Sequence, residues 1–190
     1  MIPNLTVHEK LLMCSIKRWH MVSTTRDQTL AEHSYGVMLI AMEIAECSNI
    51  DPRKVVDLAL YHDIDEVRTG DISPPAKLFM REQGYDPDSL VADNGDVKPR
   101  WDIVYMVKAA DFIESILFIS QYGVGKHAEQ VTEDLIKSFE QYVDSTIERT
   151  DPFLAGAVRA VYHELLRPVY NIWDSGKNYR SNGSMHKLGL

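Results

Sequence analysis

Two histidines and two aspartates in separate parts of the chain have the side-chain types of a metal-binding site. The stretch YHDIDEVRTG, residues 61–70, places His62 beside Asp63, while His33 comes earlier in the chain and Asp111 later. Two neutral imidazoles and two carboxylates suit a divalent transition metal, Zn, Mn, Fe, Co or Ni, and leave coordination positions for water or a substrate. The residue types therefore predict a metal site with room for chemistry.

Each candidate histidine belongs to a stripe of apolar residues at helical spacing. The first stripe begins at His33 and continues through Val37, Ile40 and Ile44. The second ends at His62 after Val55, Leu58 and Ala59. Because residues at these spacings share one face of a helix, both imidazoles are expected to point toward the core.

Two acidic residues stand where a third helical stripe calls for apolar ones. In DIVYMVKAADFIESILF the stripe runs through Val104, Val107, Asp111, Glu114 and Phe118. An unpaired buried carboxylate costs on the order of several kcal/mol, so Asp111 needs a cationic partner, which a metal ion would supply. A single inward His or Asp is more often a hydrogen-bonded core residue. Their occurrence on three predicted helices favours one shared metal site.

The elements that must position these side chains are predicted to be helices. TLAE, residues 29–32, is typical of a capping box, and Asp51-Pro52, Ser73-Pro74 and Asp151-Pro152 each pair a cap residue with a first-turn proline. These signals and the apolar spacing predict helices over residues 5–18, 29–48, 52–65, 74–83, 100–121, 127–148 and 152–172. Residues 84–99 are rich in Gly, Pro and Asp and are expected to form a surface loop. The predicted fold class is all-α.

Size and composition predict a single domain. The 190 residues, 45% of them hydrophobic, are enough for one core. We expect the domain to span residues 1–174 and a polar, flexible tail to span residues 175–190. Cys14 and Cys47 lie in helix-like patterns and are expected to be reduced, buried thiols, not a disulfide or a cysteine-based zinc site.

Charge and hydropathy restrict the partners of the chain and its location. The formal net charge is −8 and no basic stripe offsets it, which argues against broad binding to nucleic acid. The apolar runs are shorter than the roughly 20 residues that cross a bilayer, and the N-terminal residues lack a secretory signal. We therefore expect a cytoplasmic protein with no membrane partner.

Three segments of the sequence resemble the HD-domain metal-dependent phosphohydrolases. His33, the pair His62-Asp63 and Asp111 match the H…HD…D signature of that family. The segments KRWHMVSTTRDQTLAEHS (17–34), YHDIDEVRTGDISPPAK (61–77) and VKAADFIESILF (107–118) are similar, in order and separation, to the bacterial 5'-deoxynucleotidases. The resemblance covers roughly residues 8–170 and extends to small phage triphosphohydrolases that act on dATP. It implies a single-domain, HD-type helical bundle.

The resemblance implies roles for the residues around the predicted metal. The metal ligands would be His33, His62, Asp63 and Asp111. Glu66 matches the acid that positions or deprotonates the attacking water, and Asp71 matches a second acid at the reaction centre. Relatives that hold a second tightly bound metal add a histidine pair between the two aspartates, and this chain has no histidine there. One main divalent ion is therefore expected, and a second, substrate-borne ion near Glu66 and Asp71 stays open.

The resemblance also implies contacts with a nucleotide. Arg18 and Lys77 match positions that contact phosphate, and both chemistries fit, because a guanidinium grips two oxygens and an ammonium supplies a point charge. Trp19 matches the aromatic residue that lies against the sugar and helps exclude a 2'-hydroxyl. Met21 and Pro75 flank the motifs and are candidates to line the site of the base.

The resemblance, together with the predicted metal site, implies a divalent-metal-dependent phosphohydrolase that acts on 2'-deoxyribonucleotides. The products would be the deoxynucleoside and either phosphate or triphosphate, and the sequence leaves both the phosphate count and the base open. The alternative is a non-catalytic metal- and nucleotide-binding sensor on the same fold, against which the intact Glu66 and Asp71 argue. The expected partners are a small-molecule deoxynucleotide and further copies of the chain in a homo-oligomer, in the cytoplasm or, for a viral protein, the host cytoplasm.

Overall fold

Helices supply the regular structure of the residues that the computed structural model describes, 5–85 and 100–166. Within these ranges no β-strand forms, and two isolated bridges join Lys17 to Thr29 and Thr24 to Gly123. The predicted all-α fold is confirmed. In chain order the elements are α1 (Val7–Leu11), the 3-10 turn η1 (Leu12–Cys14), α2 (Leu30–Cys47), α3 (Arg53–Tyr61), α4 (Glu66–Thr69), α5 (Pro74–Glu82), α6 (Trp101–Tyr122), α7 (Gly125–Tyr142), the π-helical turn η3 (Val143–Ile147), α8 (Glu148–Thr150) and α9 (Pro152–Leu165).

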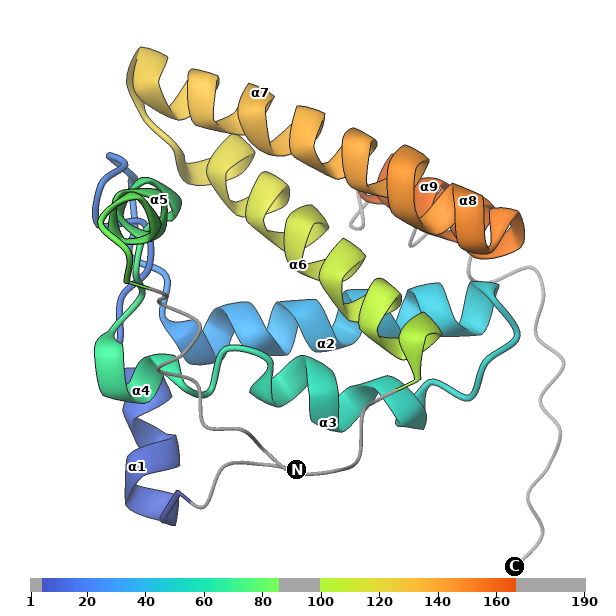
Figure 1. The fold of residues 1–190 in the computed structure, drawn as a ribbon, viewed down its shortest axis with the longest axis horizontal. Helices are drawn as coiled ribbons and strands as arrows, with labels where there is room; N and C mark the ends of the chain where they lie inside the picture. Colours follow the sequence, from blue (N-terminus) through green and yellow to red (C-terminus); the bar gives the residue numbers. More distant parts are fainter. Residues whose placement is uncertain (1–4, 86–99, 167–190) are drawn as a thin grey trace, which may run out of the picture.

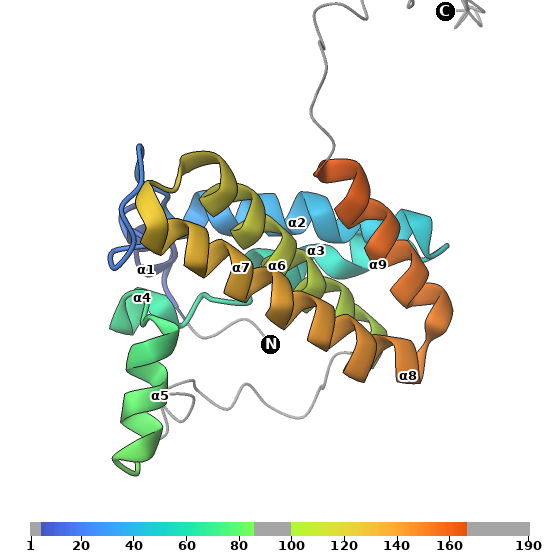
Figure 2. The same cartoon turned by 90° about the horizontal axis from the view of Figure 1, so that it is seen from above.

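Helix α6 lies at the centre of the bundle. Figure 1 shows it between α7 on one side and α2 with α3 on the other. Ile113 and Ile116 of α6 are fully buried in one cluster with Ile44 of α2, Phe139 of α7 and Val158 of α9. Burying side chains of this size stabilises the fold by about 1.5–3 kcal/mol each. Helix α5, by contrast, projects from the bundle, as Figure 2 shows.

Two of the predicted helix starts form as expected. At α2 the Glu32 N–H donates to Thr29 Oγ1 at 3.2 Å, and the Thr29 N–H donates to Glu32 Oε2 at 2.7 Å, which completes a capping box. At α9 the Asp151 carboxylate accepts from the N–H groups of Phe153 and Leu154, each at 3.0 Å. Since α2 begins at Leu30, its first turn carries His33 into the core.

Of the other two predicted starts, the one at Asp51 has a side-chain cap and the one at Ser73 lacks it. Asp51 Oδ1 accepts from the Arg53 N–H at 3.1 Å in the first turn of α3, and the same carboxylate pairs with the guanidinium of Arg53. Ser73 stands at the start of α5, where its hydroxyl donates to Met21 Sδ at 3.0 Å and caps no backbone N–H. A competing side-chain partner therefore replaced the cap at Ser73 alone, and the cap predicted at Asp51 forms.

The predicted helix over residues 5–18 is wrong beyond Cys14. The chain leaves the helical conformation there, and Trp19 has a φ of 63°, in the left-handed region. A bridge between Lys17 and Thr29 then ties the loop to the start of α2. This loop, residues 15–28, carries Arg18 and Trp19.

The predicted helix over residues 52–65 ends earlier, at Tyr61. Beyond it the backbone hydrogen bonds run to the third residue back, from Ile64 N–H to Tyr61 O and from Glu66 N–H to Asp63 O. Apolar periodicity does not reveal such a tightening, because the spacing stays close to helical over one turn. His62 and Asp63 consequently lie just past the end of α3.

The later boundaries differ less. Helix α6 closely matches the prediction over residues 100–121, while the predicted helix over residues 127–148 is interrupted by η3. Most of the predicted loop, residues 86–99, lies outside the described residues. The same holds for three predictions near the C-terminus: the end of the helix over residues 152–172, the domain boundary at residue 174 and the tail at residues 175–190. No helix among the described residues is long and apolar enough to span a membrane.

Two sequence-based expectations about burial are wrong. Cys14 and Cys47 are both exposed, because each ends its helical element and Ile44 and Ala45 take the buried positions of the last turn of α2. Val104 is 38% exposed, since the buried stripe of α6 begins at Ile103. The rest of that stripe, from Val107 to Phe118, faces inward or lies half-buried as predicted.

Candidate active site

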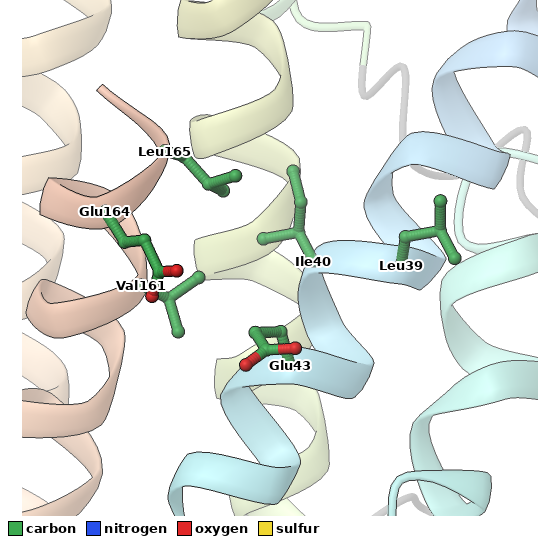
Figure 3. A pocket seen from close by; sticks show the side chains of 6 residues that line it. All are labelled: Leu39, Ile40, Glu43, Val161, Glu164 and Leu165. Carbon is green, nitrogen blue, oxygen red and sulfur yellow. The ribbon is translucent and has the colours of Figure 1, made fainter. Parts of the chain in front are cut away.

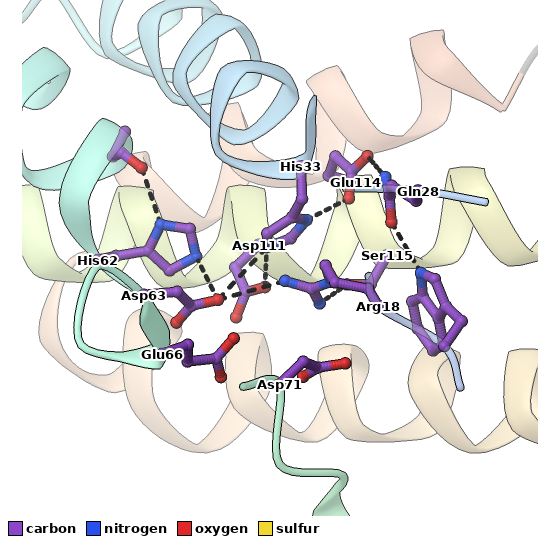
Figure 4. Close-up of polar contacts among 12 residues, drawn as sticks. Arg18, Gln28, His33, His62, Asp63, Glu66, Asp71, Asp111, Glu114 and Ser115 are labelled. Atoms are coloured by element: carbon purple, nitrogen blue, oxygen red, sulfur yellow. Dashed lines mark hydrogen bonds and ion pairs between the residues drawn. The ribbon is translucent and has the colours of Figure 1, made fainter. Parts of the chain in front are cut away.

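His33, His62 and Asp111 meet at one place. One ligand atom from each lies within 4.8 Å of the other two. His33 is fully buried in the first turn of α2, and its Nε2 lies 3.2 Å from Asp111 Oδ1 on α6. Figure 4 shows the two imidazoles and the aspartate facing a common space. This is a donor set of the kind that holds a transition metal.

Asp63 joins the same cluster. Its Oδ2 lies 3.2 Å from His62 Nε2 and 3.7 Å from His33 Nε2. The structure therefore brings together all four residues that the sequence predicts as ligands. They come from α2, the turn after α3, and α6, so three separate elements must pack correctly to assemble the set.

The imidazole nitrogens that face this space lack hydrogen-bond partners. His33 Nε2 and His62 Nε2 are buried, and neither makes a hydrogen bond despite the nearby carboxylates. The opposite nitrogens are both engaged, because His62 Nδ1 donates to the Ala59 carbonyl at 2.8 Å and His33 Nδ1 contacts Glu114 Oε2. Metal-binding histidines are typically held in this way, with one nitrogen anchored and the lone pair of the other left for the metal. The residues thus fit a divalent cation.

The electrostatics of the cluster favour a bound cation as well. Burial opposes protonation of His62, but the charges of Asp63 and Asp111 outweigh it and raise the pKa of His62 to about 9. Burial also acts to raise the pKa of Asp111, yet His33 and the Lys108 ammonium, 2.6 Å from its carboxylate, hold that pKa well below its usual range. The potential at this place therefore attracts positive charge.

Glu66 and Asp71 lie beside the cluster, and Figure 4 shows both carboxylates near Asp63 and Arg18. Burial, then the negative charges of Asp63 and Asp71, raise the pKa of Glu66 to about 8. Glu66 Oε2 is buried without a hydrogen-bond partner, and Lys77 Nζ lies 3.7 Å from Oε1. A carboxyl that titrates near neutral pH is suited to take a proton from water.

Arg18 extends from the loop of residues 15–28 into the cluster. Its guanidinium lies 3.2 Å from Asp63 Oδ2 and 3.5 Å from Ser115 Oγ, while its Nε is buried and unpaired. Trp19, the next residue, stacks on Phe118 with ring centroids 6.3 Å apart. A cation and an aromatic surface therefore stand side by side next to the candidate metal ligands.

The two residues predicted to line a base site are more peripheral. Met21 is 56% exposed, and its sulfur accepts a hydrogen bond from Ser73 at the start of α5. Pro75 is exposed in the first turn of α5. The structure brings Met21 to the start of α5 but does not place either residue within the buried cluster.

Three polar residues at the site received no role from the sequence. Gln28 is 2% exposed and bonds to both Trp19 and Glu114, and Ser115 contacts Arg18. The inward position of Glu114 was visible in the apolar stripe of α6, but its contact with His33 was not. Gln28 lies in a loop, where no periodicity marks a buried side chain.

A separate hollow lies between α2 and α9, away from these residues. Figure 3 shows its lining, which consists of Leu39, Ile40, Glu43, Val161, Glu164 and Leu165. It contains none of the predicted site residues and no imidazole. The hollow is therefore not the place of the chemistry predicted from the sequence.

Sequence comparison relates the chain to deoxynucleotide hydrolases. The family model described as "5'-deoxynucleotidase YfbR-like" matches residues 10–84. The chain is 31% identical over 142 residues to the dATP triphosphohydrolase of Salmonella phage PMBT28, with 68% of this chain and 73% of that protein covered. It is 25% identical over 189 residues to the dATP triphosphohydrolase of Acinetobacter phage SH-Ab 15497, with 86% and 92% covered. The 5'-deoxynucleotidase of Cronobacter sakazakii is 36% identical over 70 residues, which cover 34% of this chain and 35% of the enzyme.

Solved structures share the fold. The HD phosphohydrolase DatZ of cyanophage S-2L, bound to dA and one catalytic Zn²⁺ ion, superposes with a TM-score of 0.69 at 24% identity, over 84% of this chain and 95% of that chain. The PH0347 protein of Pyrococcus horikoshii OT3 gives a TM-score of 0.58 at 19% identity, over 84% and 95%. At these identities the likeness establishes the shared helical fold.

Proposed function

Because the chain belongs to the YfbR-like family of HD-domain phosphohydrolases and is a deoxynucleotide phosphohydrolase, we propose that it hydrolyses dATP to deoxyadenosine and triphosphate. The family resemblance seen in the sequence is thereby confirmed. The observation that carries the catalytic part is the pair of unpartnered nitrogens, His33 Nε2 and His62 Nε2, facing Asp63 and Asp111.

The choice of a triphosphate substrate is supported by how much of each relative the chain covers. Similarity to three phage dATP triphosphohydrolases extends over 73%, 92% and 85% of their lengths. Similarity to the 5'-deoxynucleotidases of Cronobacter sakazakii and Vibrio cholerae covers 35% and 38% of theirs. The longer matches include the region beyond residue 84, where Asp111 and Glu114 lie.

A divalent metal would be held by His33, His62, Asp63 and Asp111. When bound, such an ion lowers the pKa of a coordinated water and offsets charge on a phosphoryl oxygen. Zinc is the leading candidate, because the related cyanophage structure contains a catalytic Zn²⁺ ion and because imidazole and carboxylate suit it. Mn, Co, Fe and Ni accept the same ligands.

Arg18 and Lys77 bind the phosphates. The Arg18 guanidinium is anchored by Asp63 at 3.2 Å, so its remaining N–H groups are held ready for phosphate oxygens. Lys77 Nζ lies 3.7 Å from Glu66 Oε1 and is placed to neutralise a phosphate beside that acid. Both cations offset the charge that develops on the phosphate during the reaction.

Glu66 acts as the general base. It lies at the first residue of α4, one turn after His62, and its raised pKa lets it take a proton from water near neutral pH. Asp71 adds a second carboxylate, and a substrate-borne ion could be held between the two acids. In the overall reaction the bond between the α-phosphorus and O5' breaks, the water oxygen remains on the triphosphate, and a proton ends on O5'.

Trp19 lies against the deoxyribose, and its ring leaves no room for a 2'-hydroxyl. This ring stacks on Phe118, and Arg18 Cζ lies over it 5.7 Å from the ring centroid, so the surface assigned to the sugar adjoins the cation assigned to the phosphates. The contacts with the base are assigned to Met21, whose sulfur accepts from Ser73, and to Pro75 in the first turn of α5. Adenine is the base that the phage relatives suggest.

The test is product analysis. The protein is incubated with dATP and Zn²⁺, Mn²⁺ or Co²⁺, and the products are separated by chromatography. Deoxyadenosine with triphosphate supports the proposal, and Asp111→Ala serves as the inactive control. Turnover of dAMP but not of dATP would make the chain a 5'-deoxynucleotidase. Bound metal without any turnover would favour the non-catalytic sensor.

We also propose that the chain forms a homo-oligomer in the cytoplasm, or in the host cytoplasm if it is viral, because its nucleotide substrate is found there. Tyr35 and Leu39 on α2 are 57% and 49% exposed, and Leu165 on α9 is 40% exposed, next to the hollow of Figure 3. Exposed apolar groups of this kind favour contact between copies. Light scattering on the protein and on Leu39→Lys would test it, since a monomeric wild type contradicts the proposal.

A further inference from the structure

A chain of hydrogen bonds joins Trp19 to His33 through two buried side chains. The indole Nε1–H of Trp19 donates to Gln28 Oε1 at 2.7 Å, and Gln28 Nε2 donates to Glu114 Oε1 at 2.6 Å. The other oxygen of Glu114 contacts His33 Nδ1. Figure 4 shows this series running from the loop of residues 15–28 to α2 and α6.

In each hydrogen bond of this series, the chemistry of the two groups determines which one donates. An indole N–H can only donate, so the oxygen of the Gln28 amide must face Trp19 and its NH₂ must face Glu114. An ionised carboxylate can only accept, so His33 must donate from Nδ1 and leave the lone pair of Nε2 toward Asp111. Glu114 therefore accepts from both ends and sets the tautomer of His33.

Gln28 also holds the backbone of the loop. It is 2% exposed, and its carbonyl accepts a hydrogen bond from the Arg18 N–H at 2.9 Å. One residue thus anchors the backbone of Arg18 and the side chain of Trp19. The indole is held at its N–H by Gln28 and on one face by Phe118.

Gly36 provides independent evidence that Glu114 is held in one place. It lies on α2 one turn after His33, and a Cβ built on it would come 2.8 Å from Glu114 Cγ and 3.3 Å from Glu114 Oε1. Such a separation is too short for a real contact, so any larger residue at position 36 would displace the acid. Glycine lowers helix propensity at an interior position. Its presence here makes room for Glu114.

We propose that Gln28 and Glu114 are positioning residues that fix the sugar-facing Trp19 and the metal-facing His33 with one set of hydrogen bonds. This set of hydrogen bonds then couples the discrimination between deoxyribose and ribose to the affinity for the metal. A substitution that breaks one of the hydrogen bonds alters both properties. This inference rests on the proposed function for the role of Trp19, while the part that concerns His33 and the metal can be measured without any substrate.

The first test replaces Gln28 with leucine, which keeps a similar size and removes both hydrogen bonds. We expect the ratio of kcat/KM for dATP to kcat/KM for ATP to fall by about tenfold or more, the effect of a lost buried hydrogen bond. In a Trp19→Phe background, which has no indole N–H, the same Gln28 substitution should change the ratio little. A residue with only a structural role would lower Tm and leave the ratio unchanged, which would overturn the proposal.

The second test is Glu114→Gln. The amide of this variant has one accepting oxygen and one donating NH₂ group. Its NH₂ must therefore face either the NH₂ of Gln28 or Nδ1 of His33, and neither arrangement keeps both original hydrogen bonds. We expect the dissociation constant for Zn²⁺, measured by chelator competition, to rise by about 10–100-fold, and the dATP to ATP ratio to fall with it. Unchanged metal affinity would overturn the link to His33.

The third test uses a glycine pair. Gly36→Ala should displace Glu114 and so weaken Zn²⁺ affinity and sugar discrimination while the protein stays folded, because alanine favours the helix. Gly156→Ala in α9 is the matched control, since a Cβ there meets nothing within 4 Å. If the Gly36→Ala variant has the same Zn²⁺ affinity and the same sugar discrimination as the Gly156→Ala variant, the proposal is overturned.

The two proposals can fail separately. If the wild type hydrolyses no deoxynucleotide, the proposed function fails, and chelator competition on Glu114→Gln and Gly36→Ala still decides whether the chain positions His33. If the wild type is active and all three variants keep its metal affinity and sugar preference, the positioning proposal alone is wrong.

Discussion

His33 Nε2 lies 3.2 Å from Asp111 Oδ1, and the two residues belong to α2 and α6, the helices that carry much of the core. The candidate metal site therefore joins elements that also depend on each other for packing. Nearby are three further carboxylates, Asp63, Glu66 and Glu114. A cation that binds these residues in the folded state and not in the unfolded chain should stabilise the fold as well as support the reaction.

Removing a ligand should abolish both effects of the metal. His62→Ala and Asp111→Ala each leave an incomplete ligand set, so we expect loss of bound metal and of turnover. Metal at about 100 times its Kd stabilises by about 2.7 kcal/mol, so wild-type Tm should rise by roughly 5–10 °C on its addition, and the variants should not respond. Metal content and Tm are measured on the same samples.

A suitable control for the ligand variants is Asp134→Ala on α7, which removes an exposed acid paired with Lys137 at 3.7 Å. It should keep its metal and its Tm response. Stoichiometric metal in His62→Ala or Asp111→Ala would contradict the assignment of that residue as a ligand.

Replacing Glu66 with glutamine should separate catalysis from binding. The amide is close in size to the carboxyl but cannot take a proton, and a positioned base typically contributes about 10²–10⁴ in rate. We expect kcat to fall by that factor with metal content and the dissociation constant for dATP nearly unchanged. If the variant keeps its metal and more than about a tenth of wild-type kcat, Asp71 becomes the leading candidate for the base.

The stability of the metal-stripped protein should depend on pH through Glu66. Burial and the charges of Asp63 and Asp71 raise the pKa of this carboxyl from 4.5 to about 8. Folding therefore favours the protonated form, and the stability that this gives is fully present below pH 4.5 and is lost as the pH rises to about 8. The Glu66→Gln variant has no group that ionises at this position. In the presence of a chelator, its Tm should therefore rise relative to the wild-type Tm as the pH increases from 4.5 to about 8. A constant difference in Tm would show that Glu66 does not titrate there.

Arg18 should control substrate affinity more than metal content. Arg18→Ala removes charge-assisted hydrogen bonds to phosphate that are worth about 1.5–3 kcal/mol, so KM for dATP should rise by roughly 10–150-fold. Arg18→Lys keeps the charge without the forked geometry and should fall in between. Arg53→Ala, at an exposed arginine paired with Asp51, is the control. Loss of metal with unchanged KM would instead make Arg18 a support for Asp63.

Most of the fold followed from periodicity and caps, because those signals are local. The stripe through His33 and Val37 and the capping box at Thr29 correctly predicted where α2 begins and which face it buries. The end of α3 at Tyr61 was missed, because a switch to shorter hydrogen bonds leaves no mark in apolar spacing. The exposure of Cys47 was missed because residue type alone does not show which side of a last turn faces solvent.

The candidate site was predictable as a set of residue types but not as a network. Inward-facing His33, His62 and Asp111 could be read from helical spacing, and the structure brings their ligand atoms within 4.8 Å of one another. Arg18 stands at the last position of the helix predicted over residues 5–18, whereas it lies in a loop, so its contact with Asp63 does not follow from the sequence. Gln28 was missed entirely, since its burial depends on packing between a loop and α6.

The close approach of Gly36 to Glu114 also restricts the substitutions that this sequence can accept during evolution. Because a Cβ at position 36 would meet Glu114 Cγ at 2.8 Å, position 36 cannot gain a side chain without displacing Glu114. A descendant that gains a larger residue at position 36 would need a shorter acid at position 114, and Gln28 would then have to reach further to meet it. Positions 28, 36 and 114 should therefore be inherited as a group, and an alignment of close relatives should show them varying together.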